Sequence, residues 1–474
     1  MIWLLLACKP YPSPLDSPLV ESHAPDSPVD SPTDSPVDSA LARPAFVNPP
    51  EAPDLDPAEG SVRFEITAGT MTQIIEDTLT GESVVVEGFA YNGTTPGPTL
   101  RARLGDRVTI EFTNNLDDDT TIHWHGLAVP YEMDGVTWTN GGVPPGGTFT
   151  YSFTVEQAGT FWYHPHFNSD RQVDNGLYGM FIVEDPADPP VDREVIVVVD
   201  DWESPDDVAP PHGGVSDSHG ADGEEGLWTV NHLVQPVLTL RGGERVRLRA
   251  LNTSNSGFVD LAYPGMRQIA GDQGLLPALA EPESLLLPPG DRFELELLPG
   301  EVDFEVQDLA YSHSGGAGWD DPGTLFTVQV EEPAPAVQPA AWPFSGAPAS
   351  LPASQPDVVW VLTGDLGGPW LINGEQFPDI TVPHLALGES MVIEVRNLSP
   401  SDHPFHTHGM EMEVLSLDGV APAMAQIEDT INLRPRQVLV ARITPRYAGS
   451  WMMHCHILEH AEGGMMTVLT VDEP

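Results

Sequence analysis

The chain carries one strand-and-turn signature three times, and this repetition limits the folds that are open to it. The segments 105–114, 243–252 and 388–397 each join a turn glycine to a run of alternating apolar residues that ends in an asparagine. An asparagine-containing turn precedes each segment, at Asn92-Gly93, Asn231-His232 and Asn373-Gly374. The copies follow one another at intervals of domain size, which are too long for a solenoid repeat. The sequence therefore predicts three related domains in a row, called copies one, two and three below.

Each copy is expected to be a β-sandwich. Short runs that alternate apolar and polar residues are separated by Gly, Pro, Asn and Asp, and helical periodicity is scarce. This pattern favours an all-β chain built of Greek-key sandwiches. Proline-rich stretches indicate the boundaries between the copies. We expect domains at 61–188, 189–335 and 356–474, with a linker at 336–355.

The N-terminal residues predict an anchor and a tether. Residues 1–8 end in Leu-Leu-Ala-Cys8 and resemble the end of a bacterial lipoprotein signal. Residues 9–60 are rich in Pro, Ser and Asp and contain too little apolar surface to fold. We expect a disordered tether between a lipid on Cys8 and the folded body. The protein would then lie in the cell envelope, in the periplasm or at the outer membrane or cell surface. An ordinary cleaved leader is the alternative.

Charge and cysteine content restrict the partners and the cross-links. Acidic residues number 71 and basic residues 19, which gives a formal net charge of -52. We therefore expect no nucleic-acid partner and an attraction for cations. A solvated acidic surface suited to salty surroundings accounts for the same charge. The two cysteines are Cys8 and Cys455, so no disulfide is expected within the fold if Cys455 binds a metal.

Near its C-terminus the chain combines a thiol with imidazoles in a pattern typical of copper sites. On a β-strand alternate side chains point to opposite faces, which separates Cys455 from His454 and His456. Cys455, His460 and Met465 supply a thiolate, an imidazole and a thioether, the soft ligand set of a blue copper site. His454 and His456 must then serve a second metal centre, and one strand joins the two centres.

The repeat predicts where the second centre lies. Four His-x-His pairs occupy equivalent positions in copies one and three: His123/His125, His164/His166, His406/His408 and His454/His456. In copy two these positions hold Leu261, Tyr263, Glu305 and Gln307. Residues two apart on a strand share a face, so eight imidazoles are expected to converge between copies one and three. Eight nitrogens are too many for one copper and suit a cluster of three. His403 completes the blue site.

These motifs resemble those of bacterial, laccase-like multicopper oxidases with three domains, from residue 61 onward. The matching stretches are His123-Trp-His-Gly126, Trp162-Tyr-His-Pro-His166, His403-Pro-Phe-His-Thr-His-Gly409 and His454-Cys-His with His460 and Met465. The resemblance implies cupredoxin-like domains and four copper ions. The type 1 copper would be held by His403, Cys455, His460 and axial Met465. The type 2 copper would be held by His123 and His406, and the two type 3 coppers by His125, His164, His166, His408, His454 and His456.

The resemblance also implies a reaction. Single electrons would enter at the type 1 copper, and the cluster of three would reduce dioxygen to water by four electrons. The reductant would be a phenolic or aromatic compound, or alternatively Cu(I), Fe(II) or Mn(II). The acidic charge favours cations, whereas the 13 methionines form no methionine-rich insert of the kind that cuprous oxidases carry. A non-catalytic scaffold protein would have lost copper ligands, and this chain keeps each of them.

Two acidic residues are predicted to deliver protons. Asp134 follows the first histidine pair and matches an acidic position that the family uses to pass protons to the cluster. The glutamate that often follows the second type 1 histidine is replaced here by Ala461, and Glu462 comes next. We expect Asp134 to carry the main proton transfer, with Glu462 as the second candidate.

Overall fold

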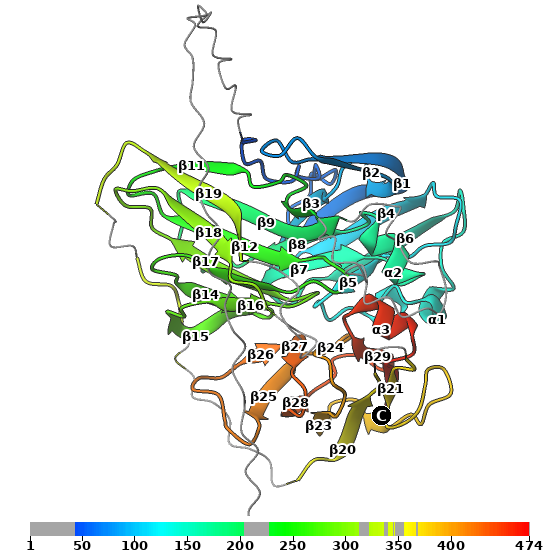
Figure 1. Ribbon diagram of the computed structural model, residues 1–474. Helices are drawn as coiled ribbons and strands as arrows, with labels where there is room; N and C mark the ends of the chain where they lie inside the picture. The colour runs from blue at the N-terminus through cyan, green and yellow to red at the C-terminus, as the bar shows by residue number, and fades with distance from the viewer. Residues whose placement is uncertain are drawn as a thin grey trace, which may run out of the picture. The chain divides into compact units, whose positions relative to one another are not determined.

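The computed structural model describes residues 43–202, 227–311, 322–335, 340–344, 346, 355–365 and 368–473. Within these ranges six β-sheets pair into three sandwiches in sequence order (Figure 1). The helices are the 3-10 helix η1 (Tyr131–Met133) and the α-helices α1 (Thr137–Asn140), α2 (Ser169–Asp174) and α3 (Leu458–Glu462). None of these helices is long and apolar enough to cross a membrane.

Copy one forms a sandwich of two four-stranded sheets. The first sheet has the order β2 (Ser83–Tyr91), β1 (Ser61–Glu76), β4 (Arg107–Asn114), β6 (Thr148–Thr154). The second has the order β3 (Gly97–Arg103), β8 (Gly179–Glu184), β7 (Gly159–His164), β5 (His123–His125). Alternate residues of β4, Val108, Ile110 and Phe112, are buried and share one core with Trp124 and Tyr163 of the second sheet. The apolar residues that recur at every second position of the sequence therefore form the face of the strand that packs in the core.

Copies two and three each combine a six-stranded with a five-stranded sheet. In copy two the larger sheet has the order β10 (Leu227–Val230), β9 (Arg193–Trp202), β12 (Val246–Asn252), β17 (Arg292–Leu297), β14 (Gln268–Gly271), β15 (Gly274–Ala280). The smaller has the order β11 (Val237–Arg241), β19 (Gly323–Glu331), β18 (Phe304–Asp308), β13 (Val259–Ala262), β16 (Leu285–Leu287). In copy three the larger sheet has the order β21 (Leu371–Ile372), β20 (Val358–Thr363), β23 (Met391–Asn397), β28 (Val438–Ile443), β25 (Met412–Leu417), β26 (Ile427–Glu428). The smaller has the order β22 (His384–Ala386), β30 (Met466–Asp472), β29 (Gly449–Cys455), β24 (His403–Thr407), β27 (Thr430–Leu433).

The three sandwiches share one strand topology. In the first sheet of each copy, the opening strand pairs in parallel with the strand of the repeated segment: β1 with β4, β9 with β12, and β20 with β23. In the second sheet the last strand pairs in parallel with an early one: β8 with β3, β19 with β11, and β30 with β22. The remaining pairs described for these sheets are antiparallel. The predicted all-β fold of three consecutive Greek-key sandwiches is confirmed.

The repeated asparagines explain why the signature recurs. Each asparagine that ends a repeated segment is fully buried, donates to two backbone carbonyls and accepts from the backbone N–H two residues on. The acceptors are Asp118 and Val143 for Asn114, Gly257 and Leu287 for Asn252, and Ser401 and Leu433 for Asn397. The donors are Leu116, Ser254 and Ser399. An amide group supplies two donors and an acceptor at once, so these positions call for asparagine.

The predicted tether at 9–60 is too long, because residues from 43 onward pack on the folded body. The ring centroid of Phe46 lies 5.6 Å from that of Phe326. The backbone N–H of Phe46 donates to the Val237 carbonyl. Asn48 accepts from the N–H of Ile196 through its side chain. The proline-rich composition predicts disorder, but this short apolar run finds sheet partners that satisfy its backbone. Cys8 and the rest of the predicted tether, up to residue 42, lie outside the described residues.

The described part of the predicted linker at 336–355 is held on copy two. Trp342 is buried against Arg245 and Arg247, whose guanidinium carbons lie 4.7 and 5.0 Å from its ring centroid. Its indole N–H donates to Glu296 at 2.9 Å. This stacking of an aromatic ring on paired cations holds the chain at Trp342 against copy two.

Copy two offers a test of the asparagine role, because its repeat positions hold no histidine. Asn252→Ala removes three hydrogen bonds at a fully buried position and takes the amide donor from the carbonyls of Gly257 and Leu287, of which Gly257 keeps the Ser254 hydroxyl as a donor. We expect the free energy of unfolding to fall by about 2–4 kcal/mol, measured by thermal or denaturant unfolding. Asn252→Asp should be at least as damaging, because a carboxylate would face both carbonyls. The exposed variant Gln307→Ala is the control, and a wild-type melting temperature for Asn252→Ala would contradict the assigned role.

Candidate metal centres

Antiparallel strand pairs set the histidines opposite one another in copies one and three. In copy one β5 pairs with β7 and His123 lies opposite His164. In copy three β24 pairs with β29 and His406 lies opposite His454. The corresponding pair in copy two, β13 with β18, carries Leu261 in the core and Glu305 and Gln307 on the surface. Copy two has no histidines at these positions, and its side chains there pack in the core or lie on the surface as in a sandwich without a metal site.

The eight paired histidines gather between copies one and three. Seven are buried and His166 is half-buried. The ring of His123 stacks on that of His408 at 3.9 Å, and the ring of His125 stacks on that of His406 at 3.7 Å. Each stacked pair takes one ring from copy one and one from copy three. The predicted convergence of four His-x-His pairs is therefore seen.

The ring nitrogens sort the histidines into smaller groups. Within each group the nitrogens lie within 4.8 Å of one another. The groups have three residues each and overlap. Two of them, His125/His164/His456 and His166/His408/His454, share no residue, and another combines His123 with His164 and His166. A further group brings His123 and His406 together with His125. This division has the form of the one that the resemblance implies, with two triads and one pair.

Most of the ring nitrogens that face the cluster have no hydrogen-bond partner within the described residues. They are buried and unpaired at His123 Nε2, His125 Nδ1, His164 Nε2, His166 Nε2 and His406 Nε2, and both ring nitrogens of His456 are unpaired. His408 Nε2 and His454 Nε2 face each other at 3.2 Å. Burial lowers the pKa of the rings of His125, His164, His166, His406, His408, His454 and His456, to about 3 for His454, so these rings are neutral and present lone pairs. Buried polar atoms without partners are unfavourable, whereas a bound cation would use each of them, so this donor set fits metal ions.

Two buried aspartates hold the rings from behind in equivalent ways. Each accepts from a histidine of its own copy through its backbone carbonyl and from a histidine of the other copy through its carboxylate. The distances are 2.8 Å for Asp134 O to His123 Nδ1, 3.0 Å for Asp134 Oδ2 to His408 Nδ1, 3.0 Å for Asp429 O to His406 Nδ1, and 3.0 Å for Asp429 Oδ1 to His125 Nε2. Because carbonyl and carboxylate oxygens accept, these bonds fix which nitrogen of each ring carries the proton and which faces the cluster.

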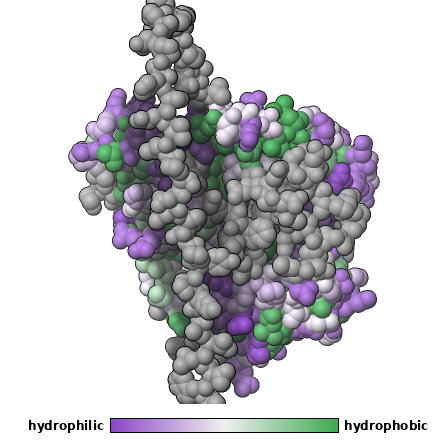
Figure 2. Space-filling view, in the orientation of Figure 1, coloured by the Kyte–Doolittle hydropathy of each residue, from purple (hydrophilic) through white to green (hydrophobic). Residues whose placement is uncertain are grey.

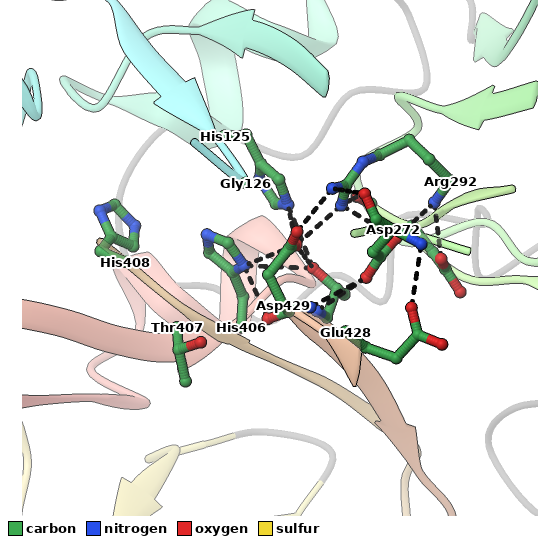
Figure 3. A network of polar contacts seen from close by, with 12 residues as sticks. His125, Gly126, Asp272, Arg292, His406, Thr407, His408, Glu428 and Asp429 are labelled. Carbon is green, nitrogen blue, oxygen red and sulfur yellow. Dashed lines mark hydrogen bonds and ion pairs between the residues drawn. The ribbon is translucent and has the colours of Figure 1, made fainter. Parts of the chain in front are cut away.

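The two aspartates differ in their remaining contacts. Asp429 accepts from both terminal nitrogens of Arg292, at 2.7 and 2.5 Å (Figure 3). It also accepts from the side-chain amide of Gln273. Burial alone would raise the pKa of Asp429, but the Arg292 guanidinium outweighs it and holds that pKa well below its usual range. Asp134 Oδ1 is buried, lies 3.4 Å from His123 Nδ1, and has no hydrogen-bond partner among the described residues.

Asp429, Thr430 and Arg292 are absent from the residues predicted above. Asp134 lies 11 residues after His123, whereas Asp429 lies 23 residues after His406. The repeat therefore does not align the two aspartates. The signal that points to Asp429 is the pseudo-symmetry of the histidine pairs, which calls for a second carboxylate in copy three.

The second predicted centre forms around Cys455. Its Sγ lies 3.3 Å from His403 Nδ1 and 3.6 Å from His460 Nδ1, and these two nitrogens lie 3.2 Å apart. All three residues are buried, and Met465 is buried in the same core. Burial raises the pKa of the Cys455 thiol, so its thiolate form calls for a bound cation. The triangle of one sulfur and two nitrogens fits a single soft metal ion.

Cys455 and its neighbours do point to different centres. Cys455 groups with His403 and His460, whereas His454 and His456 group with the histidine cluster. The backbone N–H of Cys455 donates to Met465 at 3.2 Å, which ties the strand end to the methionine. Trp370 covers the site, with its ring 3.8 Å from that of His460, and is itself buried.

Glu462 lies on the protein surface. Its side chain is exposed and accepts from the backbone N–H and the hydroxyl of Ser169, at 3.0 and 2.8 Å. Ser169 begins α2 of copy one, so this contact joins α3 to α2. Its described hydrogen bonds thus connect two copies and do not reach a histidine.

Comparisons with known proteins agree with the geometry. Family models described as multicopper oxidase match residues 74–188 and 350–474. The chain is 31% identical to a multicopper oxidase of Staphylococcus haemolyticus, over 81% of this chain and 83% of that protein. It is 29% identical to the multicopper oxidase MmcO of Mycobacterium tuberculosis, with the same coverage. A laccase structure from Pediococcus acidilactici superposes with a TM-score of 0.76 at 25% identity, over 91% of this chain and 94% of that one. The sandwiches are thus cupredoxin-like, and the chain belongs to the multicopper oxidases, copper-dependent oxidoreductases that pass electrons from a reducing substrate to dioxygen.

Proposed function

We propose that the chain is a laccase-like oxidase that takes single electrons from phenolic or aromatic compounds and reduces dioxygen to water with four copper ions. One observation carries the proposal: the Cys455 site and the eight-histidine cluster are both buried and are joined by three consecutive residues, His454-Cys455-His456. When bound, copper supplies one-electron transfer at the first site and reduction of dioxygen at the second. The protein supplies the ligands, their orientation and the protons.

The grouping of the side chains supports an assignment of ligands. His403, Cys455 and His460, with Met465 in the same core, would hold the type 1 copper. His123 and His406 would hold the type 2 copper. The two triads, His125/His164/His456 and His166/His408/His454, would each hold one type 3 copper.

The chain itself provides a short path between the two sites. Cys455 presents its sulfur to one site, and the adjacent His454 presents its ring to the other. The ring N–H at Nδ1 of His454 donates to the Cys455 carbonyl at 2.7 Å. This hydrogen bond connects the cysteine backbone directly to the imidazole, in addition to the peptide bond. Electrons that enter at Cys455 thus need no mobile carrier to reach the cluster.

Asp134 is placed to hold and move a proton. Its Oδ2 accepts from His408, while its Oδ1 keeps acceptor capacity at a buried position beside His123. Gly135 follows directly, and a Cβ there would lie 1.8 Å from the carbonyl oxygen of Ile122. The turn is therefore pressed against the strand that leads into His123, which keeps the carboxylate at the cluster. The exposed Glu462 is a weaker candidate, because its carboxylate is engaged by Ser169.

The choice of substrate rests on the cover over the Cys455 site. Trp370 and the surrounding core leave His460 only 3% exposed, so a substrate donates electrons across this cover without binding the metal. Phenols suit such outer-sphere transfer. The net charge of -52 favours the alternative, oxidation of Cu(I), Fe(II) or Mn(II), because it raises the local concentration of cations. On the face in Figure 2, hydrophilic residues are spread among hydrophobic ones over the described surface.

The lipid anchor is a proposal from the sequence. Leu-Leu-Ala-Cys8 and the Pro/Ser/Asp-rich residues that follow support lipidation of Cys8 and a position in the periplasm or at the cell surface. The folded body, from residue 43, would then be held near a membrane by the intervening segment.

The first test concerns copper content. Wild type should bind four coppers per chain and show an intense blue charge-transfer band from the Cys455 thiolate. Cys455→Ser removes the sulfur ligand, so the blue band and turnover should be lost while the histidine cluster still fills. Metal analysis and visible absorption measure both. One copper per wild-type chain after full loading would sink the assignment.

The second test concerns Asp134. Asp134→Asn keeps the size of the side chain but cannot carry a proton, so oxygen consumption should slow by about 10²–10⁴-fold. Copper content should persist, because an amide oxygen can still accept from His408 and the backbone carbonyl still accepts from His123. The blue band should persist, because the Cys455 site has no described contact with Asp134. Glu462→Gln is the matched control and should slow oxygen consumption less than Asp134→Asn does. Near-normal oxygen uptake by Asp134→Asn with intact copper sites would assign Asp134 a structural role in the turn before Gly135.

The third test separates the two substrate classes. Turnover on a neutral phenol should be fast and nearly independent of ionic strength. If cations are the substrates, turnover on Cu(I) or Fe(II) should dominate and fall steeply with salt, because salt screens the acidic field. Oxygen uptake measured with both reductants from low to high ionic strength decides between them. Negligible phenol oxidation beside fast metal oxidation would overturn the phenol proposal.

A further inference from the structure

Copy two lacks copper-ligand positions, yet one of its turns lies against the histidine cluster. A Cβ on Gly290, in the turn before β17, would lie 2.7 Å from the ring of His456. Two residues later, at the start of β17, Arg292 is fully buried. This turn of copy two therefore lies against the cluster that copies one and three form.

The Arg292 guanidinium contacts all three copies. Its Nε donates to the carbonyl of Thr160 in copy one at 3.1 Å. Its terminal nitrogens donate to the Gly290 and Asp272 carbonyls in copy two, at 3.2 and 3.3 Å. They also donate as a fork to both carboxylate oxygens of Asp429 in copy three. Paired donation of this kind fixes the orientation of the Asp429 carboxylate as well as its distance from the guanidinium.

Asp429, held in place by Arg292, in turn orients the rings of two histidines. Figure 3 shows Arg292 and Asp272 on one side of Asp429, and His125 and His406 on the other. His125 donates from Nε2 to the Asp429 carboxylate, which leaves Nδ1 facing the cluster. His406 donates from Nδ1 to the Asp429 carbonyl, which leaves Nε2 facing the cluster. A shift of Asp429 would therefore turn both rings.

Two further contacts close this arrangement. Asp272 Oδ2 accepts from the backbone N–H groups of Asp429 and Thr430, at 3.2 and 3.0 Å. Gly126, directly after His125, has a positive φ of 87°, and a Cβ there would lie 2.5 Å from Arg292 and 2.7 Å from Asp429. The glycine that ends the motif His123-Trp-His-Gly126 thus makes room for the ion pair.

We propose that Arg292 is a positioning residue for the trinuclear copper cluster, supplied by the copy that has no copper ligands, and that it acts through Asp429 on His125 and His406. This inference rests on the proposed function for the identity of the metal. Arg292 touches neither substrate nor cluster, and its effect is on which ring nitrogens face the metal and how firmly they are held.

The test uses the full chain with Arg292→Lys and Arg292→Met. Lysine keeps the charge but cannot form the fork, and methionine keeps much of the length without charge. Loss of such an outer contact commonly costs 10–100-fold in metal affinity. We expect that loss in the copper affinity of the histidine cluster, measured by competition with a chelator, and a changed electron paramagnetic resonance signal of the type 2 copper. The blue band of Cys455 should be unchanged.

Arg249 gives a matched control. It is also buried in copy two, pairs with Glu294 and Glu194, and donates to the Thr160 hydroxyl. It has no described contact with a histidine. Arg249→Lys should lower the melting temperature and leave the cluster's copper affinity and resonance signal as in wild type.

A double variant tests the route through Asp429. If Arg292 acts through that carboxylate, Arg292→Met combined with Asp429→Asn should bind copper no more weakly than Asp429→Asn alone. Additive losses would overturn the route. Unchanged affinity and resonance signal in both Arg292 variants, or equal changes in Arg249→Lys, would overturn the positioning role.

A metal-free measurement separates this inference from the proposed function. Nitrogen NMR of the histidine rings should find His125 protonated at Nε2 in wild type and a mixture of tautomers in Arg292→Met. A wild-type chain that fails to bind four coppers would defeat the proposed function, whereas an unchanged His125 tautomer in Arg292→Met would defeat the role of Arg292.

Discussion

Buried ring nitrogens that face one another without partners are the constraint on which the rest of the structure depends. Six histidines of the cluster have a ring nitrogen without a hydrogen bond within the described residues, and two further ring nitrogens face each other at 3.2 Å. Each unpaired buried polar atom costs about 1–3 kcal/mol, so the arrangement is unfavourable unless cations bind there. The fold must hold the rings in place against this cost. It does so by strand pairing in two sandwiches and by acceptors behind the rings.

The acceptors follow the pseudo-symmetry of copies one and three, and copy two breaks that symmetry. Asp134 and Asp429 each bridge a histidine of one copy to a histidine of the other. Arg292 adds its fork to Asp429, whereas Asp134 keeps one oxygen without a hydrogen-bond partner among the described residues. A carboxylate bound at both oxygens is a rigid support. A carboxylate with spare acceptor capacity can take up and release a proton. One pair of equivalent residues thus serves two purposes.

Features that depend on a local pattern could be predicted from the sequence. The alternation of apolar and polar residues predicts the sandwiches, and the repeated segments locate the His-x-His pairs. Both patterns can be recognised because each lies within single strands. The separation of Cys455 from His454 and His456 followed from the same alternation. It holds although β29 ends at Cys455, because the His456 N–H donates to the Pro404 carbonyl and keeps the chain extended along β24.

Features that arise from contacts between copies could not be predicted in this way. Arg292 and Gln273 of copy two meet Asp429 of copy three, and Arg292 also contacts Thr160 of copy one, at spacings that no repeat specifies. The packing of residues 43–60 was missed for the same reason, since the partners of Phe46 lie in copy two. Arg292 also explains what a copy without copper ligands contributes. With only copies one and three, Asp429 would be a buried carboxylate without a countercharge, free to turn with the rings it holds. Copy two supplies the countercharge in a directional form, so the histidines of two other domains keep one orientation.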